Sequence, residues 1–288
     1  MISSCKDYQR SAKPIVNNNQ GTQIKIVIFV LTLKPLMNAA RLHSSGNSFL
    51  VSLVDVFDIS GSEVAAFCKD REIDGMIMIR KNALPDIYEL SFFNNDGSPF
   101  KMCFNGSLCA SLYLKQLLNA HSFRFFAPHF GNLEARVSED TISLIFEVPK
   151  VKILPRFISQ DDLQGTCYSL SLTDNHKVVL TGHNFFKSTS FLSLAKELRA
   201  ADSVFPEGAN VHFIYKNSDT VYIRHYEKGI EKETLSCGSG CVAAAIILSE
   251  AKEIEFVSPG GKLLIQKINE NEWMLSGKPE FVRKMTTA

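Results

Sequence analysis

The chain has 288 residues, 45% of them hydrophobic, and its 31 basic and 30 acidic residues leave a net charge of +1. This length supports one large core or two modest ones. The balanced charge, without a basic stripe or tail, argues against a nucleic-acid partner. No apolar run reaches the roughly 20 residues that a membrane span needs, so we expect no membrane partner either.

The first 36 residues differ from the rest of the chain. Residues 1–23 are polar and rich in Asn, Gln and Ser, and an apolar run follows at residues 24–33. A signal peptide has a shorter leader and a small-residue cleavage site after its apolar core. We therefore expect residues 1–36 to be an extension outside the catalytic fold, and a start at Met37 would remove it.

Short strands and few helices are predicted along the remainder. Period-2 and β-branched patterns predict strands at 49–54, 76–79, 87–93, 141–148, 178–180, 211–215, 221–226, 262–265, 273–275 and 280–284. Helical patterns occur at 61–69 and 192–200. This mixture favours an α+β fold.

Two similar segments lie about half the chain apart. Cys103 and Cys237 each begin a short Gly-containing polar turn, and each turn leads into a run that is apolar nearly all round. Such helices belong in the middle of a domain, and the spacing indicates a duplication. We expect two pseudo-symmetric domains of mixed strands wrapped around a central helix: residues 37–149, to which 277–288 return, and residues 150–276.

A cysteine at the head of a buried helix has a special chemistry. The helix N-terminus carries free N–H groups and partial positive charge, which favour the reactive thiolate and can hold a carboxylate. Two such heads facing each other would place one thiol on each face of a substrate's α-carbon. One thiolate could remove the α-proton while the opposite thiol delivers another, with the carbanion stabilised electrostatically in a closed site.

Other interpretations of the cysteines remain open. The odd total of seven argues against a secreted disulfide framework and favours a cytoplasmic protein with reduced thiols. Zinc is disfavoured by the Cys-x5-Cys and Cys-x3-Cys spacings, so Cys109 and Cys241 are interpreted as packing residues. A Cys–His nucleophile could use His183, His212 or His225. Purely structural cysteines would leave both glycine-bearing turns unexplained.

At these residues the sequence resembles the diaminopimelate epimerase family, from about residue 40 to 285. The first family motif, after an Asn-x-Asp-Gly-Ser turn, corresponds to residues 103–109, and the second corresponds to residues 233–240. An early Gly-Asn-x-Phe segment matches 46–49, and Pro259-Gly260-Gly261 matches a late turn. The resemblance implies the two-domain fold, an isomerase acting on an amino acid, and no pyridoxal phosphate or metal. The sequence leaves open whether the protein forms a homodimer.

The resemblance also implies residue roles. Cys103 and Cys237 would be the acid–base pair. Backbone N–H groups near them would hold the reacting carboxylate, and side chains elsewhere would hold the rest of the substrate. The implied substrate-binding residues are Asn47, Asn94, Phe104, Asn105, Asn210, Glu227, Lys228, Gly238 and Ser239, with His183 in support.

Departures from the family pattern concern substrate binding. Lys228 stands where the family has an Arg that grips the distal carboxylate, and an ammonium is a poorer geometric match than a guanidinium fork. Phe104 replaces a Gly, and the segment with His183 lacks the family's Pro. The sequence therefore predicts either a diaminopimelate epimerase of lysine and peptidoglycan-precursor synthesis, or a racemase of another amino acid such as glutamate or histidine. A non-catalytic binding protein would not need two thiols.

Overall fold

The structure is a computed structural model that describes most of the chain after residue 37. The described residues are 38–69, 73–84, 86–148, 150–160, 163–172, 175–181, 191–201, 205, 208–218, 220–228, 230–248 and 251–284. The predicted extension at 1–36 lies outside them, as does His183. None of the described helices has the length and apolarity that a membrane span needs.

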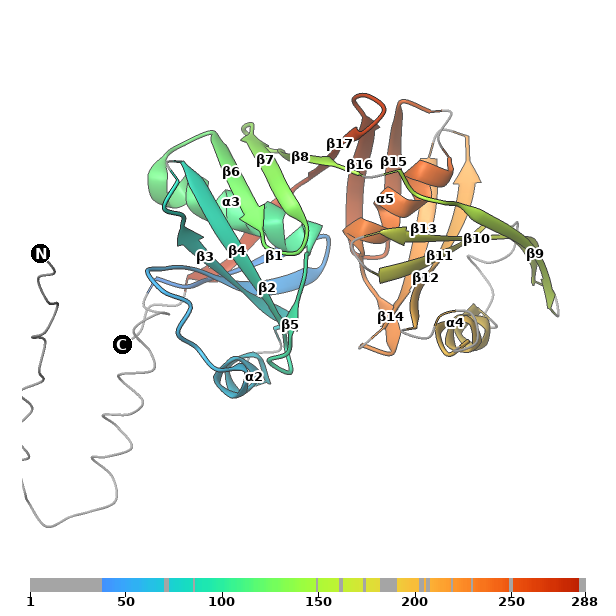
Figure 1. The fold of residues 1–288 in the computed structure, drawn as a ribbon, viewed down its shortest axis with the longest axis horizontal. Helices are drawn as coiled ribbons and strands as arrows, with labels where there is room; N and C mark the ends of the chain where they lie inside the picture. The colour runs from blue at the N-terminus through green and yellow to red at the C-terminus, as the bar shows by residue number, and fades with distance from the viewer. Residues whose placement is uncertain are drawn as a thin grey trace, which may run out of the picture. The chain divides into compact units, whose positions relative to one another are not determined.

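The first half wraps a sheet around one long helix, α3 (Figure 1). Antiparallel β1–β2 is followed by parallel β2–β3, antiparallel β3–β4, parallel β4–β6 and antiparallel β6–β7–β8. The short strand β5 pairs with β4 immediately before α3. The bounds are β1 Ala40–Ser44, β2 Asn47–Val54, α2 Gly61–Lys69, β3 Gly75–Lys81, β4 Ile87–Asn94, β5 Pro99–Phe100, α3 Phe104–Leu118, β6 Ser122–Ala127, β7 Gly131–Val137 and β8 Ile142–Glu147.

The second half repeats this order around α5. Its pairings are antiparallel β10–β11, parallel β11–β12, antiparallel β12–β13, parallel β13–β15 and antiparallel β15–β16–β17, with β14 beside β13. The bounds are β9 Leu154–Gln160, β10 Leu163–Leu172, β11 Asn175–Thr181, α4 Phe191–Arg199, β12 Ala209–Asn217, β13 Thr220–Glu227, β14 Lys232–Thr234, α5 Gly238–Ile247, β15 Glu253–Ser258, β16 Gly261–Lys267, β17 Glu272–Gly277 and β18 Pro279–Lys284.

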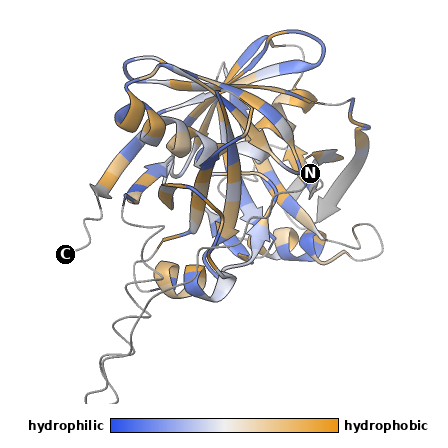
Figure 2. Ribbon diagram, turned by 60° about the vertical axis from the view of Figure 1, so that its left-hand side comes forward, coloured by the Kyte–Doolittle hydropathy of each residue, from blue (hydrophilic) through white to orange (hydrophobic). Residues whose placement is uncertain are grey.

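The two halves share strands and a core. Strand β17 pairs antiparallel with β8 of the first half, and β18 pairs antiparallel with β1. One cluster of buried side chains contains residues of both α3 and α5, while smaller clusters lie under α2 and α4. Hydrophobic and hydrophilic residues alternate along many strands, as expected for a sheet with one buried face (Figure 2).

These observations confirm the predicted fold class of two similar α+β halves, each with a central helix. The helices predicted at 61–69 and 192–200 correspond to α2 and α4. Strands β1, β5, β6, β7, β9, β10, β14 and β15 were not predicted. Several of them, such as β6 and β7, mix charged and apolar residues, and their pairing with neighbours decides their structure more than their own composition does.

Candidate active site

Cys103 lies at the N-cap of α3. Its backbone is extended (φ −137°, ψ 114°), and its Sγ accepts a hydrogen bond from the backbone N–H of Gly106 at 3.3 Å. The thiol also lies 4.0 Å from Oδ1 of Asn47. The helix therefore begins directly at the sulfur, which receives one of the N–H groups that a helix N-terminus leaves free.

Cys237 occupies the equivalent position at the N-cap of α5. Its backbone is nearly identical (φ −139°, ψ 104°), but its side chain makes no capping bond. Its Sγ instead lies 3.4 Å from the hydroxyl of Ser239. Cys237 is also more enclosed, with 6% of its surface exposed, whereas Cys103 is half-buried. The two halves thus present one cysteine each, in similar backbone geometry and different surroundings.

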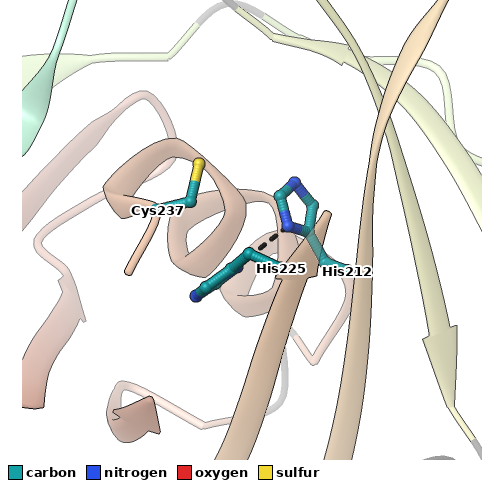
Figure 3. Close-up of side chains that lie close together, drawn as sticks. All are labelled: His212, His225 and Cys237. Atoms are coloured by element: carbon teal, nitrogen blue, oxygen red, sulfur yellow. Dashed lines mark hydrogen bonds between the residues drawn. The ribbon is translucent and has the colours of Figure 1, made fainter. Parts of the chain in front are cut away.

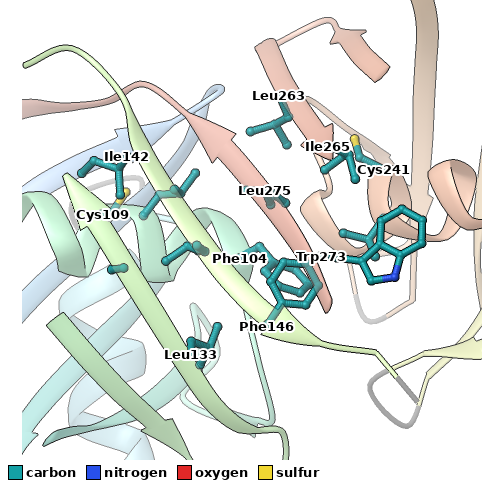
Figure 4. Packing of buried hydrophobic residues seen from close by; sticks show 14 of the residues in the cluster. Phe104, Cys109, Leu133, Ile142, Phe146, Cys241, Leu263, Ile265, Trp273 and Leu275 are labelled. Atoms are coloured by element: carbon teal, nitrogen blue, oxygen red, sulfur yellow. The ribbon is translucent and has the colours of Figure 1, made fainter. Parts of the chain in front are cut away.

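The N-termini of α3 and α5 meet. A side chain added at Gly238 would place its Cβ 2.8 Å from Cβ of Phe104, so glycine is required where the helix heads touch. Nδ2 of Asn105 donates to the hydroxyl of Ser236, the residue before Cys237, at 3.3 Å. The ring of Phe104 packs 4.5 Å from that of Phe146, centroid to centroid, between the halves (Figure 4). The substitution of the family's Gly by Phe104 is therefore accommodated by aromatic packing.

Burial and like charge control ionisation of both thiols. The pKa of Cys103 is raised to about 12, chiefly by desolvation and in smaller part by the nearby Cys237 and Glu227, while the N–H of Gly106 opposes the rise. The pKa of Cys237 is also raised to about 12, chiefly by desolvation and then by Glu227, while Lys177 and Ser239 oppose the rise. Since a charge on one sulfur opposes a charge on the other, the pair titrates as a coupled system that loses one proton at a time.

Of the predicted substrate residues in the first half, Asn47 lies at the cysteine. Its Oδ1 approaches Cys103, and its Nδ2 lies 3.5 Å from the carboxylate of Asp74. That carboxylate also accepts from the backbone N–H of Ser48 at 2.7 Å. Asn94 ends β4, where its Nδ2 donates to the hydroxyl of Ser98 at 2.9 Å.

In the second half, Asn210 lies at the start of β12, and Glu227 ends the neighbouring strand β13. Oδ1 of the buried Asn210 accepts from the backbone N–H of Lys228 at 2.9 Å. The carboxylate of Glu227 accepts from the hydroxyl of Thr234 at 2.5 Å and acts electrostatically on both thiols. The side chain of Lys228 is exposed. The structure thus groups Cys103, Cys237, Asn47, Phe104, Asn105, Glu227, Gly238 and Ser239 around the two helix heads, and Asn210 binds the backbone of the residue that follows Glu227.

A buried polar cluster lies behind Cys237. His212 and His225 are fully buried, and their Nδ1 atoms lie 2.9 Å apart (Figure 3). Burial lowers the pKa of both imidazoles, that of His225 to about 3, and the charge of Lys177 adds to this effect. From the sequence, these histidines were candidates only for a Cys–His nucleophile, and Lys177 was not predicted as part of the site. Lys177 stands directly before the apolar run 178–180, and nothing local in the sequence indicates that it is buried.

His212, His225 and Cys237 are also the group within the described residues that could hold a metal ion. One potential ligand atom from each lies within 4.8 Å of the others. Imidazole nitrogens and a thiolate suit a soft divalent cation. Lys177 supplies a positive charge to the same place, however, and a second cation would be repelled. Cys109 and Cys241 are buried in the core, as the packing role predicted for them requires.

The duplicated fold brings one cysteine from each half to the meeting point of the two helix heads, and the relatives of the chain are isomerases. The family model for diaminopimelate epimerase matches residues 176–282. The diaminopimelate epimerase of Helicobacter pylori (strain HPAG1) is 30% identical over 80% of this chain and 86% of its own length. That of Archaeoglobus fulgidus is 29% identical over 82% of this chain and 91% of its own. The chain belongs to the diaminopimelate epimerase family.

Solved structures support the same fold. A phenazine biosynthesis protein of the PhzF family from Enterococcus faecalis superposes with a TM-score of 0.64, at 16% identity, covering 85% of this chain and 96% of that one. A structure described as a predicted epimerase from Pseudomonas aeruginosa gives a TM-score of 0.66 at 12% identity, covering 88% and 100%. At these identities the likeness concerns the fold alone.

Proposed function

We propose that the protein interconverts LL- and meso-diaminopimelate by two-base proton transfer between Cys103 and Cys237. The observation that carries the proposal is the meeting of two cysteine-headed helices, which contact each other at Gly238 and Phe104. Full-length relatives named diaminopimelate epimerase support the choice of substrate.

The proposed steps use residues already described. Free N–H groups at the heads of α3 and α5, including those of Phe104, Asn105, Gly238 and Ser239, would bind the α-carboxylate. The thiolate of one cysteine would take the α-proton, and the thiol of the other would donate its proton to the opposite face. Asn47, Asn94, Asn210 and Glu227 would orient the substrate, with Lys228 and His183 toward its distal end. Burial excludes water and strengthens these interactions.

The proposal places the reaction in lysine and peptidoglycan-precursor synthesis, in the cytoplasm, without metal or pyridoxal phosphate. A second candidate is racemisation of a smaller amino acid such as glutamate or histidine. The exposed Lys228 favours keeping this candidate, because a single ammonium cannot form the bidentate pair that a guanidinium makes with a distal carboxylate.

A substrate panel in deuterated water tests the proposal. LL-diaminopimelate, L-glutamate and L-histidine are incubated with the protein under reducing conditions, because two neighbouring thiols could oxidise. We expect α-deuterium to enter diaminopimelate fastest, with loss of stereochemical purity. Exchange confined to glutamate or histidine would favour the second candidate, and exchange in none of the three would contradict both.

A further inference from the structure

The internal duplication shows which side chains the fold requires behind each cysteine. Three residues after each cysteine, a glycine packs directly on a strand: a Cβ at Gly106 would lie 2.6 Å from Cδ1 of Ile77, and one at Gly240 would lie 2.5 Å from Cε1 of His212. Ile77 and His212 are therefore equivalent positions in the two halves.

Strand register extends this equivalence to two more positions. Ile77 pairs with Phe92 as His212 pairs with His225. On the opposite edge of these strands, Ile77 pairs with Val51 and His212 pairs with Val179. Phe49 lies two residues before Val51, and Lys177 lies two residues before Val179. Phe49 and Lys177 therefore also occupy equivalent positions in the two halves. The first half thus has Phe49, Ile77 and Phe92 where the second half has Lys177, His212 and His225.

All six of these side chains are buried. Phe49, Ile77 and Phe92 are at most 2% exposed and pack in the core with α3, and Lys177, His212 and His225 are at most 1% exposed. The same fold therefore accommodates apolar residues at these positions. A buried ammonium costs much more free energy than a buried phenyl ring, so its presence in one half alone indicates a role beyond packing.

The charge of Lys177 affects the ionisation of Cys237 but not that of Cys103. It lowers the pKa of Cys237, whereas it is absent from the groups that act on Cys103. The other titratable groups around Cys237 are Glu227 on β13, Cys103 on α3, Cys241 on α5 and the two histidines. Of these groups, Glu227 and the other sulfurs oppose a thiolate at Cys237, and the two histidines are neutral. Among the described residues around Cys237, Lys177 is therefore the cation that favours the thiolate.

The histidines are neutral polar groups that feel the charge of Lys177, and His212 packs against Gly240 of α5. An Nδ1–Nδ1 hydrogen bond needs one donor and one acceptor, so the ring that donates keeps a lone pair on Nε2 while the ring that accepts carries its hydrogen there. Both Nε2 atoms are buried without a partner among the described residues. The pair thus offers one unused N–H and one unused lone pair in the cluster that includes the sulfur of Cys237.

We propose that Lys177, together with the His212–His225 pair, acts as a positioning residue that stabilises the thiolate of Cys237. When this thiolate forms, the Sγ–H bond breaks, the proton goes to solvent, and the electron pair stays on the sulfur. The proposal rests on the proposed function, and it means that the two cysteines receive different support: the N–H of Gly106 donates to Cys103, whereas the ammonium of Lys177 acts on Cys237.

Alkylation of the substrate-free protein tests this proposal. Each thiol is followed by peptide mass mapping during treatment with iodoacetamide from about pH 6 to about pH 10. The rate at Cys237 is compared between the wild-type protein and variants, so that the different exposure of the two cysteines does not enter the comparison.

The variant Lys177→Met removes the charge, and Lys216→Met, at an exposed lysine of β12, is the matched control. We expect Lys177→Met to slow alkylation of Cys237 about tenfold at neutral pH, which corresponds to a rise of about one pKa unit. Lys177→Arg and the control should keep the wild-type profile, and Cys103 should not slow. An unchanged Cys237 profile in Lys177→Met would overturn the proposal. Because no substrate is present, this result is independent of the deuterium-exchange panel.

Discussion

At the scale of single residues, burial controls the ionisation of the two cysteines more than attraction between charges does. Both catalytic candidates have a pKa raised to about 12, chiefly by desolvation, so a free thiolate is disfavoured at neutral pH. Substrate binding would bring an ammonium group close to the sulfurs and change that balance. Desolvation also keeps the buried histidines neutral, and for an imidazole this means that the pKa is lowered.

The histidine pair predicts a sensitivity to acid. In the folded protein the pKa of His225 is about 3 and that of His212 is also lowered, whereas unfolded histidines titrate near 6.5. The unfolded state therefore binds more protons below about pH 6.5, and stability contributed by the neutral pair is lost as the pH falls from there toward 3.

Thermal unfolding at about pH 7.5 and about pH 5 measures this effect. His212→Ile with His225→Phe, the side chains of the first half, should reduce the loss of melting temperature between the two conditions. His129→Gln, at an exposed position in the turn before β7, is the control and should leave the loss unchanged. An equal loss in the double variant and the wild type would show that the pair does not titrate as described.

At the scale of elements, the two central helices are joined through their first turns. The hydrogen bond from Asn105 of α3 to Ser236, directly before α5, connects the residues that follow and precede the two cysteines. Oδ1 of Asn105 has no partner among the described residues. Asn105 therefore joins the two helix heads by a hydrogen bond, in addition to the contact between Phe104 and Gly238.

A double-mutant cycle of Asn105→Ala and Ser236→Ala measures that connection. We expect each single variant to lower the free energy of unfolding by about 1 to 3 kcal/mol, because it leaves a buried polar group unpaired, with a coupling of about 1 kcal/mol. Denaturant unfolding gives these values. Ser111→Ala, whose hydroxyl bonds only within α3 to the carbonyl of Ser107 at 2.8 Å, is the control and should show no coupling with Ser236→Ala. Additive effects of Asn105→Ala and Ser236→Ala would contradict the link.

At the scale of the whole molecule, much of the fold could be predicted from the sequence because the duplication is visible in it. Two Cys–Gly turns with apolar helices indicated two halves with central helices, and the structure confirms this. The sequence could not show that β17 pairs with β8, because pairing between distant strands depends on tertiary contacts. Strands with mixed composition, such as β6 and β7, were missed for the same reason.

The sequence predicted the cysteines of the candidate site but not the buried lysine near one of them. Cys103 and Cys237 stood out because glycines beside a cysteine at a helix head are unusual, and the structure brings these heads together. Lys177 was missed because a single lysine in an apolar strand carries no local sign that it is buried. Only the comparison of equivalent positions in the two halves shows that it stands where the first half has Phe49.

The account's central claim is that both cysteines are needed for stereoinversion. The most direct measurement compares Cys103→Ala and Cys237→Ala with the wild type, following α-deuterium incorporation and loss of stereochemical purity of LL-diaminopimelate under reducing conditions. We predict that each variant inverts the substrate about 1000-fold more slowly, because either the acid or the base is missing, while Cys109→Ala retains most of its activity. Full turnover by both single variants would contradict the two-cysteine mechanism.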